Sequence, residues 1–134
     1  MKFNQAIEDK NLKVLKKYLD SGEAGVNDYY SGWTALQIAA NKGHLKVVEL
    51  LVERGADMNV RHSISKLTAF HLAALNEHAE VVKYLAAKGA DINIKMRADV
   101  SILRPLRDEG KNDMVKLLMD LGVKDDGCQE EKCF

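Results

Sequence analysis

The sequence has few of the residues that cross-link or interrupt a fold. Its 134 residues include one proline and two cysteines, and both cysteines, Cys128 and Cys133, lie among the last seven positions. The body of the chain therefore has no disulfide framework, which fits a reducing compartment. Two thiols are also too few to hold a structural zinc ion. We interpret them as thiols of a flexible acidic tail that can form intermolecular disulfides during handling.

Long apolar stretches are absent as well. The longest apolar cluster, Val47 to Val52, is interrupted by Glu49 and is far shorter than a transmembrane helix. The first ten residues carry charges where a secretion signal needs an apolar core. We therefore expect a soluble, cytoplasmic protein that does not enter a membrane.

The chain also lacks an excess of either charge. Lysine plus arginine equal aspartate plus glutamate at 20 each, so the formal net charge is zero. This balance removes the electrostatic reason to expect nonspecific binding to nucleic acid or to an anionic membrane, although a local patch remains possible. The apolar fraction of 46% is typical of a folded protein, and the length is that of one domain.

What the sequence does contain is an internal repeat. Thr34–Ala40 and Thr68–Ala74 match at an offset of 34 residues. The same offset relates two further pairs of segments: Gly43–Leu51 with Glu77–Leu85, and Gly55–Val60 with Gly89–Ile94. Weaker copies flank these, because Ser101 follows Thr68 by 33 residues and Gly22 precedes Gly55 by 33. Four copies of about 33 residues nearly fill the chain.

Each copy has the pattern of two short helices. Leu36, Ala39 and Ala40 recur at helical spacing, and so do the valines and leucines of Val47–Val52. Thr34 and Thr68 stand where an N-cap accepts hydrogen bonds from the free amides of the first helix. Glycine follows the second helix, where a left-handed residue is favoured, at Gly55, Gly89 and Gly122. One helix pair cannot bury its apolar side alone, so the copies are expected to stack.

The Thr-x-Leu-His-x-Ala-Ala opening, the Gly-His step and the Gly-Ala-Asp-x-Asn ending resemble the ankyrin repeat. The resemblance covers residues 3–124 and is most specific over 32–94. It implies an all-α solenoid of about four stacked helix-turn-helix repeats with short turn fingers. The expected repeats are 1–27, 28–60, 61–94 and 95–124, with the first and last as caps, followed by the acidic tail 125–134.

The terminal copies depart from the pattern in the way that stacking requires. The last copy has Arg104, Arg107 and Asp108 where inner copies are less charged, as expected for a face that meets water. Pro105 is expected near the fourth residue of its helix, where it would remove one hydrogen bond and distort the first turn. The first copy lacks its turn and begins directly at the helix.

The histidines are the obvious candidates for chemistry, and the repeat gives most of them a structural role. The resemblance implies that His71 braces its turn through hydrogen bonds, as Gln37 can do in the preceding copy, and that His44 and His78 are framework residues. His62 lies in a variable loop, where we expect a solvated or contact residue. The sequence contains no phosphate-loop pattern and no histidine-cysteine metal spacing. We predict no catalytic residue, no metal and no cofactor, and keep an enzyme only as a remote alternative.

Function is therefore expected where the copies differ. In ankyrin-like stacks the turns project as fingers and the first helices line a concave groove. The first finger contains Tyr29, Tyr30 and Trp33, which are favoured binding anchors unless one or two of them fold back over the end of the stack. Unequal loop lengths, with Lys66 in place of the usual turn glycine, predict that the fingers are not ideal hairpin turns. The candidate partner-binding residues are Tyr29, Tyr30, Trp33, Asn41, Lys42, Arg61, His62, Lys66, Leu75, Asn76, Lys95 and Arg97.

The leading hypothesis is a monomeric module that binds a protein partner with apolar and acidic features, and not nucleic acid. Within this hypothesis two roles remain open. The chain could be a stand-alone inhibitor or immunity-type neutraliser of a partner enzyme or toxin. It could also be a small adaptor that bridges two proteins through its groove and its convex face.

Overall fold

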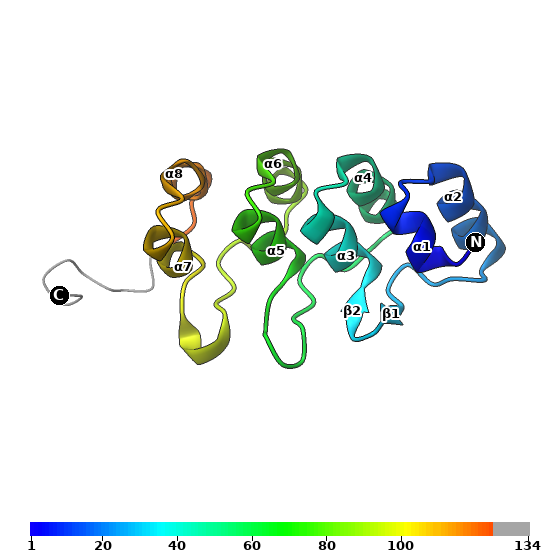
Figure 1. Ribbon diagram of the computed structural model, residues 1–134, viewed down its shortest axis with the longest axis horizontal. Helices are drawn as coiled ribbons and strands as arrows, with labels where there is room; N and C mark the ends of the chain where they lie inside the picture. Colours follow the sequence, from blue (N-terminus) through cyan, green and yellow to red (C-terminus); the bar gives the residue numbers. More distant parts are fainter. Residues whose placement is uncertain (125–134) are drawn as a thin grey trace, which may run out of the picture.

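The computed structural model describes residues 1–124 and shows a row of helix pairs (Figure 1). The first helices of the pairs form one layer, the second helices form another, and the loops between pairs project on one side. Within the layers α1 packs on α3 and α3 on α5, while α2 packs on α4, α4 on α6 and α6 on α8. The predicted all-α solenoid of stacked helix pairs is confirmed. The pairs are α1 (Phe3–Glu8) with α2 (Leu12–Ser21), α3 (Ala35–Lys42) with α4 (Leu45–Glu53), α5 (Ala69–Leu75) with α6 (Ala79–Ala87), and α7 (Leu103–Asp108) with α8 (Asn112–Leu121).

The inner helices begin and end as their sequence predicts. The Thr34 hydroxyl accepts a hydrogen bond from the Gln37 amide at 3.2 Å, and the Gln37 side chain accepts one from the Thr34 amide at 2.9 Å. Thr68 and His71 form the same reciprocal pair. Both helices therefore start with a capping box. The predicted left-handed glycines are also present, with φ of 89°, 95° and 101° at Gly55, Gly89 and Gly122.

The core runs along the whole stack between the two helix layers. Small side chains at Ala39, Ala40, Ala73 and Ala74 are fully buried, which lets neighbouring helices approach closely. In the first pair, α1 starts two residues after the N-terminus without a preceding turn, as predicted, and buries Phe3 and two other apolar side chains. The cysteine pair and the acidic tail predicted for 125–134 lie outside the described residues.

The predicted effect of Pro105 is wrong. Because α7 begins at Leu103, Pro105 is the third residue of the helix and not a residue beyond its first turn. The first four amides of an α-helix have no intrahelical acceptor, so a proline there removes no helical hydrogen bond. The arginines of this cap, Arg104 and Arg107, are exposed as predicted.

Asparagine side chains tie each loop to the next along the stack. The side-chain oxygen of Asn27 accepts a hydrogen bond from the Asp57 amide at 2.8 Å. Asn59 does the same for the Asp91 amide at 2.8 Å, and Asn93 for the Lys124 amide at 2.7 Å. The recurrent Asn of the repeat therefore fixes the spacing between neighbouring loops.

A second series of bonds ties the ends of the first helices together. The imidazole of His78 bonds the Asn41 carbonyl at 3.0 Å, and the Lys111 ammonium donates to the Leu75 carbonyl at 2.6 Å. His44 likewise contacts the carbonyl of Glu8. Each carbonyl is among the last of its helix and lacks an intrahelical donor. The framework role predicted for His44 and His78 is thus to cap the helix of the preceding pair.

The three fingers have different backbones. Tyr29–Tyr30 (β1) and Trp33–Thr34 (β2) form an antiparallel hairpin, and its two loop residues, Ser31 and Gly32, have φ of 56° and 87°. The prediction of a non-ideal turn is therefore wrong for this finger, since positive φ at both positions is typical of a tight hairpin turn. The second finger contains no assigned strand, and the third contains the single 3-10 turn Arg97–Asp99.

Candidate functional site

The two tyrosines of the first finger lie in different environments. Tyr29 is 62% exposed, whereas Tyr30 turns back and stacks on Phe3, with ring centroids 5.7 Å apart. Phe3 in turn meets the edge of the Tyr18 ring at 5.8 Å. Burial raises the pKa of Tyr30, and the nearby Asp28 carboxylate adds to this effect. Tyr30 therefore covers the first pair of the stack, and Tyr29 is the tyrosine that this finger presents to a partner.

Trp33 joins the first finger to the second. Its ring stacks on the imidazole of His62, with centroids 3.8 Å apart and planes inclined by 17°. The Nδ1 atom of His62 accepts hydrogen bonds from the backbone amides of Ile64 at 3.3 Å and Ser65 at 3.1 Å. His62 is thus held on its face by Trp33 and at its edge by its own loop. The two fingers form a joined surface and not independent loops.

Arg61 joins the second finger to the third. Its guanidinium donates a hydrogen bond to the carbonyl of Lys95 at 2.8 Å and approaches that of Lys66 at 3.5 Å. The sequence placed Arg61 among residues that contact a partner, but its donors are already used within the protein. Lys66 itself is exposed and has a left-handed backbone, with φ of 62°.

The candidates at the ends of α3 and α5 form a polar edge beside the fingers. The Asn76 side chain donates to the Asn41 side chain and to the Leu72 carbonyl, both at 2.8 Å. Lys42 is exposed at the end of α3, and Leu75 is half-buried at the end of α5. The side chains of Asn41 and Asn76 therefore bridge neighbouring helices while remaining accessible.

Two hollows open on the concave side. A smaller one of about 200 Å³ lies beside Trp33 and is lined also by Gln37, Ile38, Asn41 and Leu72. A larger one of about 380 Å³ lies between the second finger, the third finger and α7. The residues that line the larger hollow are Ser65, Leu67, Met96, Arg97, Val100, Arg104, Pro105 and Asp108. The structure thus brings Trp33 and Asn41 to one hollow and Arg97 to the other.

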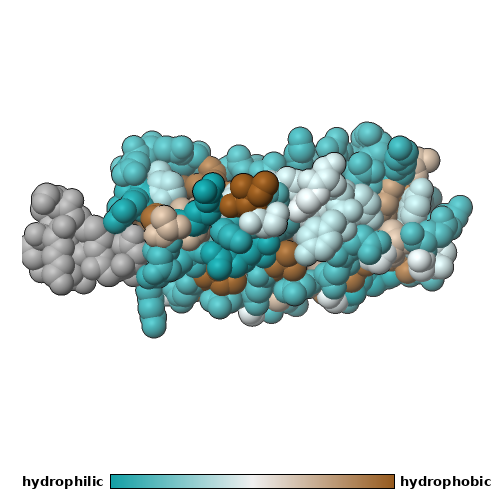
Figure 2. Space-filling view, turned by 90° about the horizontal axis from the view of Figure 1, so that it is seen from below, coloured by the Kyte–Doolittle hydropathy of each residue, from teal (hydrophilic) through white to brown (hydrophobic). Residues whose placement is uncertain are grey.

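One exposed apolar residue was missed among the candidates. Ile64 in the second finger is 70% exposed, more than Tyr29. Its signal in the sequence is a large aliphatic residue between two serines, Ser63 and Ser65, in a loop where nothing else requires it. Figure 2 shows the finger side of the molecule, where hydrophobic surface gathers toward the middle among hydrophilic residues.

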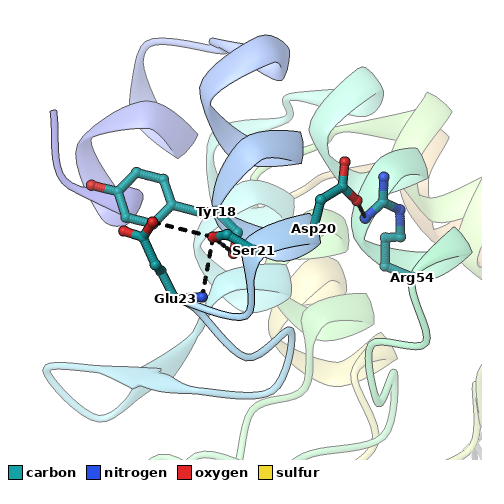
Figure 3. Close-up of polar contacts among 5 residues, drawn as sticks. All are labelled: Tyr18, Asp20, Ser21, Glu23 and Arg54. Atoms are coloured by element: carbon teal, nitrogen blue, oxygen red, sulfur yellow. Dashed lines mark hydrogen bonds and ion pairs between the residues drawn. The ribbon is translucent and has the colours of Figure 1, made fainter.

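The second helices hold their charged residues in contacts within the protein. Arg54, which follows α4, forms an ion pair with Asp20 of α2 at 2.5 Å (Figure 3). In the same view Ser21 donates to the carbonyl of Tyr18 and lies within hydrogen-bonding distance of Glu23. The Lys88 ammonium lies 5.7 Å from the ring centroid of Tyr84. These contacts support the stack on the side away from the fingers.

The remaining histidine chemistry is structural. The ring of His71 accepts from the Thr68 amide and contacts the Ile94 carbonyl at 2.8 Å, while Gln37 donates to the Val60 carbonyl at 3.0 Å. The bracing predicted for both residues is confirmed. Burial lowers the pKa of His71 to about 4, with a further lowering from Arg61 that the Ile94 bond opposes. Within residues 1–124, no group of three histidine or acidic side chains is placed to hold a metal ion.

Membrane insertion also finds no support in the helices. Among the described residues, none of the helices combines the length and the apolar character needed to cross a bilayer. The longest helices have 10 residues.

Comparison with known proteins identifies the repeat. The family model described as ankyrin repeats (3 copies) matches residues 3–96. An ankyrin repeat protein of Rickettsia felis is 39% identical over 57 residues, which are 42% of this chain and 21% of that protein. The ankyrin repeat, SAM and basic leucine zipper domain-containing protein 1 of Ovis aries is 33% identical over 55 residues, or 41% of this chain and 12% of that protein. Protein phosphatase 1 regulatory subunit 12A of Mus musculus is 39% identical over 51 residues, or 37% and 5%. The matched stretch is about a fifth or less of each of these three relatives.

Proposed function

The chain belongs to the ankyrin-repeat family, whose repeats are protein-interaction modules, and on that premise we propose that it binds a protein partner through its fingers and concave side. The observation that supports this proposal is the pair of exposed apolar side chains on adjacent fingers. Tyr29 and Ile64 are 62% and 70% exposed. Exposed aromatic and aliphatic side chains of this kind become binding anchors when a partner desolvates them.

The loops that carry these two residues are held in place before any partner arrives. Tyr29 lies on the hairpin strand that pairs with Trp33–Thr34, and Trp33 stacks on His62. His62 accepts the amide of Ile64. A preorganised surface loses less conformational entropy on binding than a mobile one, so this bracing favours affinity.

The test is co-purification of a partner from the native cell. We expect wild type to recover a specific protein and the double variant Tyr29→Ala/Ile64→Ser to lose most of it. Alanine at Tyr30 or Trp33 is unsuitable, because their rings pack on Phe3 and His62 and their loss would disturb the fold. The matched control is Met119→Ala, which removes another exposed apolar side chain (53% exposed) from α8.

Equal recovery by wild type and the double variant would contradict the proposed anchors. The recovered partner also separates the two roles within this function. If the partner is an enzyme whose activity falls when purified chain is added, the chain acts as an inhibitor. If activity is unchanged and a third protein is recovered with it, the chain acts as an adaptor.

A further inference from the structure

We propose that the hollow between the second and third fingers anchors a protein segment in which a large apolar side chain stands directly beside an aspartate or glutamate. This inference rests on the proposed protein-binding function and specifies the chemistry of the partner. It concerns the hollow of about 380 Å³ lined by both fingers and by α7.

The walls of the hollow set its preference for an apolar side chain. Leu67 comes from the second finger, Met96 and Val100 from the third, and Pro105 from α7. All four are only partly buried, so each keeps apolar surface that water now contacts. An aliphatic or aromatic side chain of a partner would remove that surface from water.

The charges around the hollow set its preference for an acidic neighbour. The loops 61–67 and 95–100 together contain four cationic side chains and one anionic side chain, although the whole chain is neutral. The charged residues are Arg61, Lys66, Lys95, Arg97 and Asp99. The positive potential at these fingers is therefore a local property that complements an acidic segment.

Arg97 is the residue placed to recognise the acid. It lines the hollow, is exposed, and makes no hydrogen bond or ion pair with any other described residue. A guanidinium can bind a carboxylate through two parallel hydrogen bonds. Asp108 lines the hollow from α7 and repels an acid there. The partner's carboxylate is therefore directed to the third finger and its apolar side chain to the walls.

The same features favour a protein segment over a nucleic acid. Binding of single-stranded nucleic acid depends on aromatic side chains that stack on bases and on many phosphate contacts. None of the residues that line this hollow is aromatic. Its walls are aliphatic side chains, methionine and proline, which suit the side chain of a peptide.

The experiment is a selection of displayed random peptides on the full chain, followed by affinity measurements with a synthetic consensus peptide. We expect the selected sequences to share a large apolar residue directly beside an aspartate or glutamate. Arg97→Glu should weaken binding of the consensus peptide about tenfold or more, and Arg97→Lys should weaken it less. Lys83→Glu, which makes the same charge change on an exposed residue of α6, is the matched control and should leave the affinity unchanged.

The other outcomes each overturn the inference. A selection that yields no consensus, or a consensus without an acidic residue, contradicts it, as does an equal effect of Arg97→Glu and Lys83→Glu. Peptides whose binding depends on Tyr29 and Ile64 but not on Arg97 would refute this pocket while leaving the proposed function intact. Binding of a single-stranded DNA oligonucleotide that is lost in Arg97→Glu, without selected peptides, would assign the patch to nucleic acid.

Discussion

The imidazole of His78 lies directly over the backbone of Gly43. A β-carbon added at Gly43 would stand 2.5 Å from Nδ1 of His78 and 2.7 Å from two ring carbons. The opposite nitrogen of the ring bonds the carbonyl of Asn41 at 3.0 Å, so the ring cannot move aside without losing that bond. The glycine of the Gly-His step is therefore required by the histidine of the next repeat as well as by its own turn.

This contact makes Gly43→Ala more costly than the same change at Gly110. Both glycines have left-handed backbones, with φ of 74° and 73°, but nothing lies within 4 Å of a β-carbon at Gly110. We expect Gly110→Ala to lower the free energy of unfolding by about 1–2 kcal/mol through backbone strain alone. Gly43→Ala should lose about 1–3 kcal/mol more because of the clash. Urea unfolding measures both, and equal losses would show that His78 moves freely.

Glu77 occupies the equivalent turn between α5 and α6 without the advantage of glycine. Its φ is 59°, in the left-handed region that most residues avoid. Glu77→Gly should therefore raise the free energy of unfolding by about 0.5 kcal/mol, as relief of strain exceeds the added entropy of the unfolded chain. Glu80→Gly, inside α6, is the control and should lower it by about 1 kcal/mol. A loss of stability in Glu77→Gly would contradict the prediction.

His71 makes the stability of the fold depend on pH. Its pKa is about 4 in the folded protein and 6.5 as the ordinary value, so the unfolded chain takes up the proton first as pH falls. This contribution is complete above about pH 6.5 and is lost progressively between pH 6.5 and 4, by about 3 kcal/mol in total. Lowering of the His44 pKa acts in the same direction.

The variant His71→Gln isolates this effect, because Gln37 already makes the corresponding bonds in the preceding repeat. We expect the variant to fold and to lose less stability than wild type between pH 6.5 and 4. Thermal unfolding at several pH values, followed by circular dichroism, measures the difference. Identical pH profiles for the two proteins would refute the role of His71.

The core predicts the cost of truncating buried side chains. Leu50 is 6% exposed and Val81 is 1% exposed. Leu50→Ala and Val81→Ala should each lower the free energy of unfolding by on the order of 2–4 kcal/mol, through lost burial and the cavity that remains. Lys83→Ala on the exposed side of α6 should change it little. Losses under half a kcal/mol at the buried positions would mean that these side chains are not in a packed core.

The parts of the fold that could be predicted from sequence are those governed by local rules. A threonine before an apolar helix and a glycine after it act within one turn, so the capping boxes at Thr34 and Thr68 and the left-handed Gly55 and Gly89 follow directly. The position of Pro105 was misjudged by one residue because the last helix starts later than its repeat predicts. Helix ends are sensitive to such shifts.

The candidate site was less predictable because its contacts join residues far apart in the chain. Tyr30 packs on Phe3, and Trp33 on His62, across 27 and 29 positions. Composition marked this finger as aromatic but could not say which rings were already occupied. The bond from Arg61 to the Lys95 carbonyl depends in the same way on the stacking of neighbouring loops. Ile64 was overlooked because an isolated aliphatic residue in a loop carries little signal.

The asparagine bonds between loops give the stack a connection that any further copy could also make. Asn27, Asn59 and Asn93 each offer a side-chain oxygen to a backbone amide in the following copy, at 2.7–2.8 Å. A backbone amide is supplied by almost any residue, so the joint does not depend on which two copies meet. Duplication of one inner unit in the gene would therefore add a new finger and lengthen the recognition surface without redesign of the rest.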